Sequence, residues 1–149
     1  MIAIACDHAA LEMKQTIMKL MEEMGLEYKD FGTYTEDSCD YPIFASRAAN
    51  AVTSGECDRG ILICGTGIGM SIAANKVKGI RCALCHDTFS AEMTRRHNDS
   101  NMLAMGARTT GIEVAKTIAK IWLETPFDGG RHERRVALIS DIENGKTLE

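Results

Sequence analysis

The residues best placed to do chemistry in this sequence are a cysteine and the glycines that follow it. Cys64 ends an apolar run that begins at Ile61, and the next residues read Gly65-Thr66-Gly67-Ile68-Gly69 before a helical pattern starts. A thiol at the amino end of a helix faces unpaired backbone N–H groups, which stabilise the thiolate as a base or nucleophile. The alternative is that Cys64 packs in the core and the glycines only form a tight connector. Three alternate glycines directly after the cysteine favour the functional interpretation.

The glycine loop differs from the common nucleotide-binding loops. Met70 stands where the dinucleotide fingerprint has its third glycine, and the Gly-Lys-Ser/Thr of a Walker A loop is absent. What remains is a run of backbone N–H groups that suits a small anion. That anion is either a phosphate or an oxyanion formed during a reaction.

Three further side chains could move protons. Asp7 and His8 follow the first apolar run, and His97 lies at the end of a helical pattern. Carboxylates and imidazoles are the usual general acids and bases. Structural alternatives exist, since Asp7 can cap the helix that follows it and cations at a helix C-terminus suit the helix dipole. Both interpretations stay open for Asp7 and His97.

A cluster of arginines follows Gly129-Gly130. Arg131, Arg134 and Arg135 fall on one face of a predicted helix at spacings of three and four. The alternative is a solvated basic face paired with nearby acids. Because clustered cations are unfavourable in the first turn of a helix unless an anion compensates, we expect this face to hold a phosphate.

The elements that must position these groups alternate along the chain. Strands are predicted at 2–6, 28–31, 60–64, 80–84 and 102–105, and helices at 11–24, 43–52, 69–76, 89–97, 113–123 and 131–142. This alternation predicts a parallel sheet covered on both faces. The chain is therefore expected to form one α/β domain over residues 1–149, a Rossmann-like three-layer α/β/α sandwich with a five-stranded parallel sheet.

Ligands bind such sheets beyond the carboxyl ends of the strands, where the strand order reverses. The residues directly after the predicted strands are Asp7, His8, Cys64, His86, Asp87, Gly106 and Arg108. We therefore expect these residues to lie at one edge of the sheet.

Composition excludes several classes of partner. A net charge of −4, a single Trp and 5% aromatic residues argue against a nucleic-acid-binding surface. No uncharged apolar stretch reaches the ~20 residues that a membrane helix needs, and the first residues show no signal-peptide pattern. We expect a cytoplasmic protein whose six cysteines are reduced thiols. Cys82 and Cys85 have a Cys-x-x-Cys spacing, but positions i and i+3 of a strand face opposite ways, which disfavours a metal site.

Together these groups suit one reaction. A thiolate base, an oxyanion-binding loop, a histidine acid and an arginine clamp can work without a metal or a cofactor. They are suited to isomerising a phosphorylated sugar, in which proton removal next to a carbonyl forms an enediolate and the proton returns to the neighbouring carbon.

Over almost its whole length the sequence resembles the B-type ribose-5-phosphate isomerases, within the group that includes galactose-6-phosphate isomerase subunits. The segments that carry the resemblance are Ala5-Cys6-Asp7-His8, Asp40-Tyr41-Pro42, Gly60 to Gly69, Ile72-Ala73-Ala74-Asn75-Lys76, Arg96-His97-Asn98-Asp99 and Gly129-Gly130-Arg131-His132. One branch of the family uses a carboxylate base after the glycine loop, and Met70 occupies that position here. The resemblance therefore points to Cys64 as the base.

The resemblance also implies roles for individual residues. Cys64 would move the proton between C1 and C2, His97 would open the sugar ring, and Asp7 would assist at the hydroxyls. The enediolate would be stabilised by Gly65, Thr66, Gly67, Ile68 and Gly69, the pocket would be lined by Tyr41 and Asn98, and the phosphate would be held by His8, Arg108, Arg131 and Arg135.

The resemblance implies interconversion of ribose 5-phosphate and ribulose 5-phosphate without a metal or cofactor. A homodimer or a dimer of dimers with active sites shared between subunits is expected. Two alternatives remain open at this point. The substrate could be a hexose 6-phosphate of the allose or galactose type, or the protein could be a sensor that binds a sugar phosphate without turnover.

Overall fold

The computed structural model describes residues 1–149 and contains a five-stranded sheet in which all pairings are parallel. The strands are β1 (Ile2–Cys6), β2 (Tyr28–Asp30), β3 (Arg59–Cys64), β4 (Cys82–Leu84) and β5 (Met102–Gly106), in the order β2-β1-β3-β5-β4. The helices are α1 (Leu11–Glu23), α2 (Tyr41–Thr53), α3 (Ile68–Ala74), α4 (Thr88–Asn98), α5 (Ile112–Glu124) and α6 (Arg131–Glu143). The predicted α/β class and five-stranded parallel sheet are confirmed.

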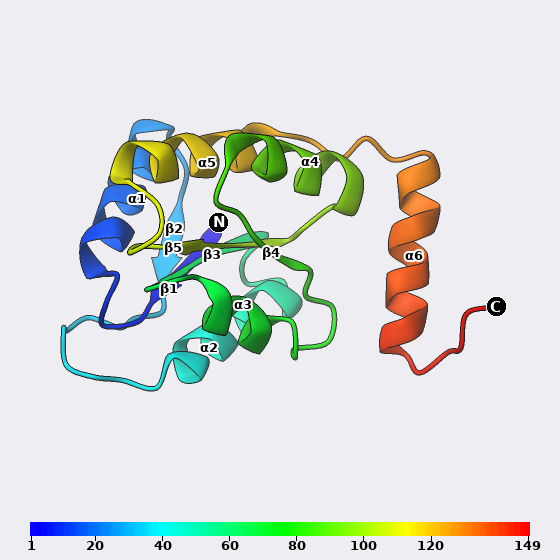
Figure 1. The fold of residues 1–149 in the computed structure, drawn as a ribbon, viewed down its shortest axis with the longest axis horizontal. Helices are drawn as coiled ribbons and strands as arrows, with labels where there is room; N and C mark the ends of the chain where they lie inside the picture. The colour runs from blue at the N-terminus through cyan, green and yellow to red at the C-terminus, as the bar shows by residue number, and fades with distance from the viewer.

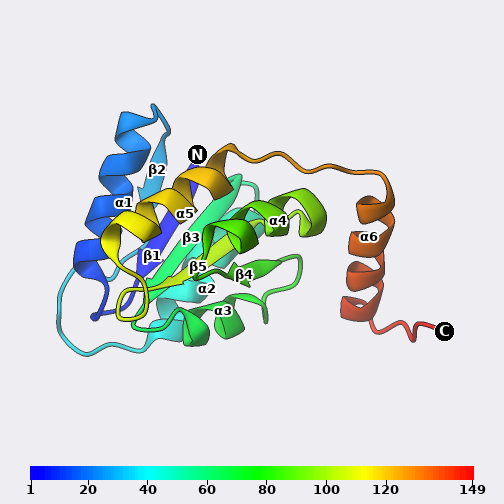
Figure 2. The same cartoon turned by 45° about the horizontal axis from the view of Figure 1, so that its top comes forward.

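The sheet is buried on both faces, as Figures 1 and 2 show. Alternation along the strands sends successive side chains into two separate cores. Ile61 and Ile63 join the core under α1, α4 and α5, whereas Leu62 and Cys64 join the core under α2 and α3. The three-layer α/β/α sandwich is therefore confirmed, and the side chain of Cys64 points to the layer of α2 and α3.

Short local signals set the helix ends. Pro42 occupies the first turn of α2, where its missing N–H costs nothing. Asp87 caps α4, because its carboxylate accepts the Ser90 N–H at 2.7 Å. In α5, Ala115, Ile118, Ala119 and Trp122 form the buried stripe that fixes the helix on the sheet. None of the helices combines the length and apolarity needed to cross a membrane.

Helix α6 stands apart from the sandwich. Figures 1 and 2 show it beyond the β4 edge of the sheet, joined to α5 by an extended segment. None of its residues is buried. Its attachments to the body include a stack of His132 on His97 and a hydrogen bond from the Gly79 N–H to Glu143 at 2.9 Å. A helix of this kind, with no buried face, is held by few contacts within its own chain.

The strand order reverses between β1 and β3. The chain leaves β1 through α1 toward one edge of the sheet, and α2 then carries it back across the sheet to β3. Cys6 pairs with Ile63 in the register of these strands, so Asp7 and Cys64 emerge side by side. This is the position at which open α/β sheets bind ligands.

Candidate active site

Cys64 lies at the carboxyl end of β3 with a polar contact on its sulfur. The side chain is only 5% exposed, and the Gly67 N–H donates to Sγ at 3.1 Å. Burial raises the pKa of other cysteines, to about 12 for Cys6 and Cys82 and to about 11 for Cys85. Cys64 differs from these cysteines in that its sulfur accepts a backbone N–H of the glycine loop.

The glycine loop has a shape that side chains would not permit. Gly67 has a φ of 75°, and a Cβ there would come within 2.8 Å of the Met105 backbone. At Gly69 a Cβ would meet the Tyr41 ring at 2.7 Å, so the missing side chain lets the phenol pack over the loop. The backbone N–H groups of Gly65 and Thr66 make no hydrogen bond within the chain. These donors are available to an anion above Cys64.

A cleft of about 480 Å³ opens over this loop. Its lining residues are Asp7, Tyr41, Cys64, Gly65, Thr66, Ile68, Gly69, Ile72 and Arg108. Arg108 is placed by the backbone, since its N–H donates to the Gly65 carbonyl at 2.9 Å. The cleft therefore combines a thiol, a carboxylate, a guanidinium and free N–H groups, as predicted for the carboxyl edge of the sheet.

Asp7 is 8% exposed, and its position bears on whether it caps helix α1. Its carboxylate accepts the Ala9 N–H at 2.9 Å, which stabilises the turn between β1 and α1. The helix itself begins after Ala10, which has no side-chain cap. The prediction that Asp7 could cap α1 is therefore wrong, because three residues separate it from Leu11, the first residue of the helix. One carboxylate oxygen holds the turn while the side chain lines the cleft.

His8 is half-buried and contacts the loop between β2 and α2. Its Nδ1 accepts the Cys39 N–H at 3.3 Å, and the Cys39 sulfur lies 3.7 Å from the same nitrogen. Sequence reasoning missed this contact, because the segment before Tyr41 has no periodic pattern from which its path could be deduced.

His97 and Asn98 lie at the opposite edge of the sheet from Cys64. Helix α4 starts after β4 and runs back along the sheet over 11 residues, about 16 Å. The Asn98 carbonyl accepts the Arg81 Nε–H at 3.1 Å, and Arg81 directly precedes β4. Both residues of the 97–98 pair are therefore at the amino ends of the strands, and the structure does not bring them to the Cys64 cleft of the same chain.

The residues around His97 form a second cluster. The rings of His97 and His132 stack with centroids 4.2 Å apart and planes 10° from parallel. Partial burial and the positive charges of His97, Arg131 and Arg135 lower the pKa of His132. Arg131 and Arg135 are exposed on α6. His132 was not among the predicted functional residues, although it adjoins Arg131 in the Gly-Gly-Arg-His segment.

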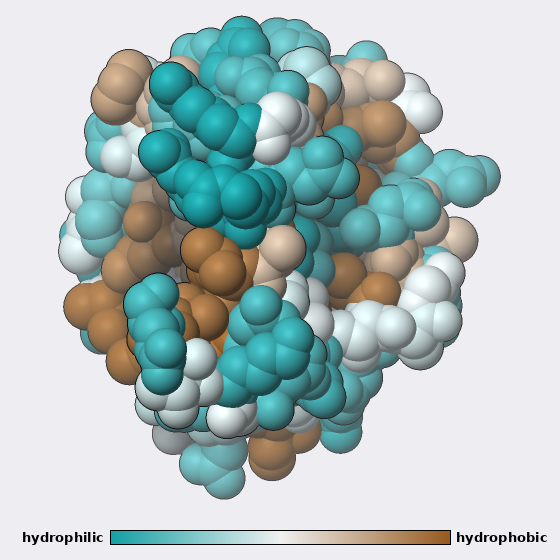
Figure 3. Space-filling model, turned by 90° about the vertical axis from the view of Figure 1, so that its right-hand side faces the viewer, coloured by the Kyte–Doolittle hydropathy of each residue, from teal (hydrophilic) through white to brown (hydrophobic).

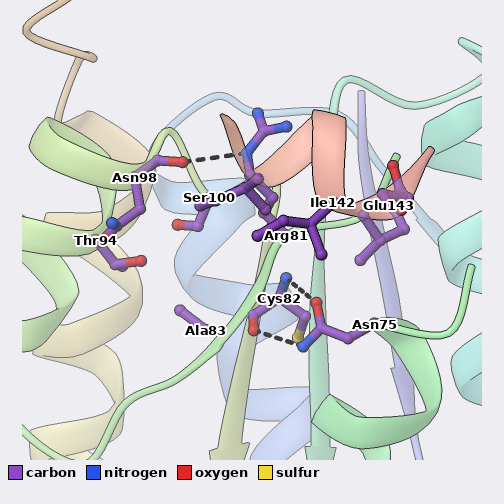
Figure 4. Close-up of a pocket in the computed structure, with 11 residues that line it drawn as sticks. Asn75, Arg81, Cys82, Ala83, Thr94, Asn98, Ser100, Ile142 and Glu143 are labelled. Carbon is purple, nitrogen blue, oxygen red and sulfur yellow. Dashed lines mark hydrogen bonds between the residues drawn. The ribbon is translucent and has the colours of Figure 1, made fainter. Parts of the chain in front are cut away.

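The gap between α6 and the body is an open groove of about 480 Å³ beside this cluster. Figure 4 shows Ile142 and Glu143 of α6 on one side, and Arg81, Cys82 and Asn98 on the other. Figure 3 faces the same side of the molecule and shows apolar surface among hydrophilic residues. Ile142 is 59% exposed, so this part of the chain leaves apolar surface uncovered.

Four predicted carboxyl-edge residues are not among those that line the cleft: His8, His86, Asp87 and Gly106. His86 follows β4, and its Nδ1 lies 3.5 Å from Thr109 Oγ1. Asp87 caps α4, and hydrogen bonds from Ser90 lower the pKa of its carboxyl. The predicted position of His86 and Asp87 after β4 is confirmed, and the role that the structure shows for Asp87 is to cap α4.

The switch-point cleft, its thiol and the free N–H groups of its loop are the arrangement expected of an α/β enzyme that moves protons on a small anionic substrate. The Ribose/Galactose Isomerase family matches residues 2–139. Ribose-5-phosphate isomerase B of Escherichia coli is 49% identical over 95% of this chain and 95% of its own. D-erythrulose-4-phosphate isomerase of Pectobacterium atrosepticum is 44% identical over 96% of this chain and 95% of its own.

The fold is also closely similar to that of a solved structure. Ribose-5-phosphate isomerase B of Clostridium thermocellum superposes with a TM-score of 0.95 at 49% identity, covering 98% of this chain and 99% of that one. The chain belongs to the Ribose/Galactose Isomerase family. It is an aldose–ketose isomerase.

Proposed function

We propose that this protein interconverts ribose 5-phosphate and ribulose 5-phosphate with Cys64 as the base. The observation that carries the proposal is the Cys64 sulfur, which accepts the Gly67 N–H at 3.1 Å inside a cleft with free N–H groups. The names of the Escherichia coli and Clostridium thermocellum relatives support the choice of a pentose phosphate.

In the proposed reaction, the Cys64 thiolate removes the proton from C2 of the open-chain aldose. The C2–H bond breaks, the electrons form the C1–C2 double bond, and the charge moves to O1. The N–H groups of Gly65 and Thr66, with Gly67, Ile68 and Gly69 shaping the loop, stabilise this enediolate. The thiol then returns the proton to C1 while the O2 proton passes to O1, which gives the ketose. Asp7, which lines the cleft, assists transfer between the two oxygens.

The reaction involves no net oxidation or reduction, because the proton that Cys64 takes from C2 returns to C1 and the electrons stay on the substrate. It therefore needs no electron donor or acceptor, and we propose that it proceeds without a metal or cofactor. The protein must also bind the phosphate and the sugar ring of the substrate. We assign His8 and Arg108 to the phosphate and Tyr41 to the sugar, because Arg108 and Tyr41 line the cleft and His8 adjoins Asp7.

A second copy of the chain is proposed to complete each cleft. His97, Asn98, Arg131 and Arg135 lie at the opposite edge of the sheet from their own Cys64, about one helix length away. A twofold axis would bring this cluster of one copy over the cleft of the other and create two identical sites. His97 would then open the sugar ring, Asn98 would line the pocket, and the two arginines would complete the phosphate site. The exposed apolar residues of α6 are consistent with such an interface.

The experiment that tests the proposed function is turnover of the purified protein on ribose 5-phosphate, allose 6-phosphate, galactose 6-phosphate and D-erythrulose 4-phosphate, with and without a chelator. We expect the highest kcat/KM with the pentose and no effect of the chelator. Preference for a hexose or tetrose phosphate would contradict the assigned substrate while keeping the isomerase chemistry. Binding of all four without turnover would contradict the proposal and indicate a sensor.

A further inference from the structure

We propose that Cys39 is a positioning residue for His8: its backbone N–H donates to Nδ1 and so presents the Nε2–H of His8 to the substrate phosphate. The inference rests on the proposed function for the phosphate role of His8. The hydrogen bond itself, at 3.3 Å, is independent of that role. It adds Cys39, whose side chain has no assigned part in the reaction, to the residues that shape the site.

Cys39 is the anchor of an otherwise exposed loop. Residues 34–38 and Asp40 are all exposed, and Cys39 alone among them is half-buried. The contact with His8 ties this loop to the turn after β1. Tyr41, which lines the cleft, follows two residues later at the start of α2. One contact therefore connects two predicted substrate-binding residues.

The backbone of His8 is already fixed by the turn around it. The Asp7 N–H donates to the Ile63 carbonyl at 3.1 Å, and the Ala10 N–H donates to the Asp7 carbonyl at 3.2 Å. What remains free is the rotation of the imidazole and the choice of its protonated nitrogen. The Cys39 contact constrains both, because it engages only one of the two ring nitrogens.

The direction of the hydrogen bond determines the tautomer. A backbone N–H can only donate, so Nδ1 must carry a lone pair and the proton of the neutral ring must be on Nε2. The Cys39 sulfur, 3.7 Å from Nδ1, lies on the same side of the ring. Nε2–H is then the donor left for a ligand. A neutral His8 in the other tautomer would offer the phosphate oxygens a lone pair and repel them.

The first test is the protonation state of the His8 ring nitrogens, measured by ¹⁵N NMR on the intact protein at a pH where the ring is neutral. The chain has only four histidines, and a His8→Gln spectrum assigns the resonances. We expect Nδ1 to show the resonance of an unprotonated nitrogen and Nε2 that of a protonated one. Protonated Nδ1 in the neutral ring would overturn the inference whether or not the protein turns over sugar.

The second test removes the donor. Cys39→Pro deletes the N–H, and we expect KM for the sugar phosphate and Ki for inorganic phosphate to rise together by about 3–10-fold, with kcat changed by less than about twofold. Cys39→Ala is the conservative variant that keeps the N–H and should restore both constants. Ser38→Pro is the matched control for loop stiffness, since the Ser38 N–H makes no hydrogen bond.

The outcomes separate this inference from the proposed function. If His8→Gln raises KM and Ki but Cys39→Pro, folded by circular dichroism, leaves both unchanged, the positioning role is wrong and the phosphate role stands. If His8→Gln changes neither constant, the phosphate role fails, and the inference falls with it even when Nδ1 is unprotonated. If Cys39→Pro does not fold, the NMR result on the wild-type chain decides.

Discussion

The Cys64 cleft and the His97 cluster are built in opposite ways. The cleft lies on buried strand ends, and its loop contains Gly67 and Gly69, where a Cβ would clash with the Met105 backbone and the Tyr41 ring. The His97 cluster lies at the far edge of the sheet and depends on α6, a helix with no buried residue. The cleft can therefore keep its geometry within one chain, whereas the α6 part of the cluster has few contacts in its own chain to fix it.

This difference shows how the proposed reaction can be divided. The step that needs accurate placement, proton transfer between neighbouring carbons, is assigned to the rigid region. Ring opening by His97 and the part of the phosphate site formed by Arg131 and Arg135 are assigned to residues that a second copy would bring and order. The predictions below test the two regions separately.

The largest effect is expected in the cleft, from Cys64→Ala. Removing the base should lower kcat by about 10²–10⁴-fold with little change in KM, because the substituted side chain acts on the reacting carbons. Steady-state kinetics with the preferred sugar phosphate measure it. Cys57→Ala is the matched control, since that buried cysteine precedes β3 at the other end of the strand and should keep kcat. Comparable losses in both variants would contradict the assignment.

In the His97 cluster, Arg135→Ala should act on binding. Loss of a charged hydrogen bond to phosphate is expected to raise KM by about 10–100-fold while kcat changes less. Arg134→Ala removes an adjacent exposed arginine of α6 and serves as the control, with an expected change below about twofold. If Arg134→Ala had the larger effect, the phosphate would be held by Arg134 and the assignment to Arg135 would be wrong.

The difference in packing predicts that Gly67→Ala and Gly130→Ala lower the free energy of unfolding by different amounts. Gly67 and Gly130 both have positive φ, but a Cβ at Gly67 would clash with the Met105 backbone and one at Gly130 would meet nothing within 4 Å. Gly130→Ala should lower the free energy of unfolding by about 1 kcal/mol, from backbone strain alone. Gly67→Ala should cost at least about 2 kcal/mol, with a loss of activity. Urea denaturation measures both, and equal costs would contradict the difference in packing.

The smallest effect concerns pH at the His97–His132 stack. Partial burial and the neighbouring positive groups hold the pKa of His132 below its ordinary 6.5. Because the folded pKa is lower than the unfolded one, the folded state resists protonation, so stability is lost as pH falls below about 6.5. An NMR titration of the His132 ring should give a midpoint below 6.5, and Arg135→Gln should raise it. A midpoint at or above 6.5 would contradict the proposed charge environment.

Most of the fold could be predicted because its signals are local and strong. The strands around Ile4, Ile61 and Leu103 are apolar runs, and the helices between them have apolar stripes with glycine or proline at their ends. Topology then places Asp7, Cys64 and Arg108 at one edge, as the structure confirms. The detachment of α6 could not be predicted, since the apolar stripe of Leu138, Ile139 and Ile142 is typical of a helix that packs on its own chain.

The sequence predicted which residues belong to the candidate site, but not that His97 and Asn98 lie far from Cys64 within one chain. The sequence did contain a signal for the position of His97: a helix after a parallel strand runs back along the sheet, so a residue at its end must lie at the amino edge. The Cys39–His8 contact had no such signal, because it joins an irregular loop to a turn across 31 residues.

The division of one site between two copies is tested most directly by mixing two inactive variants, Cys64→Ala and His97→Asn, under conditions that allow the subunits to exchange. If the sites are shared, half of the dimers in an equal mixture contain one copy of each variant, and each of these has one intact site. The account predicts recovery of about one quarter of wild-type activity. A mixture as inactive as its components, with exchange shown by mass spectrometry, would place Cys64 and His97 in the same chain's site and contradict the account.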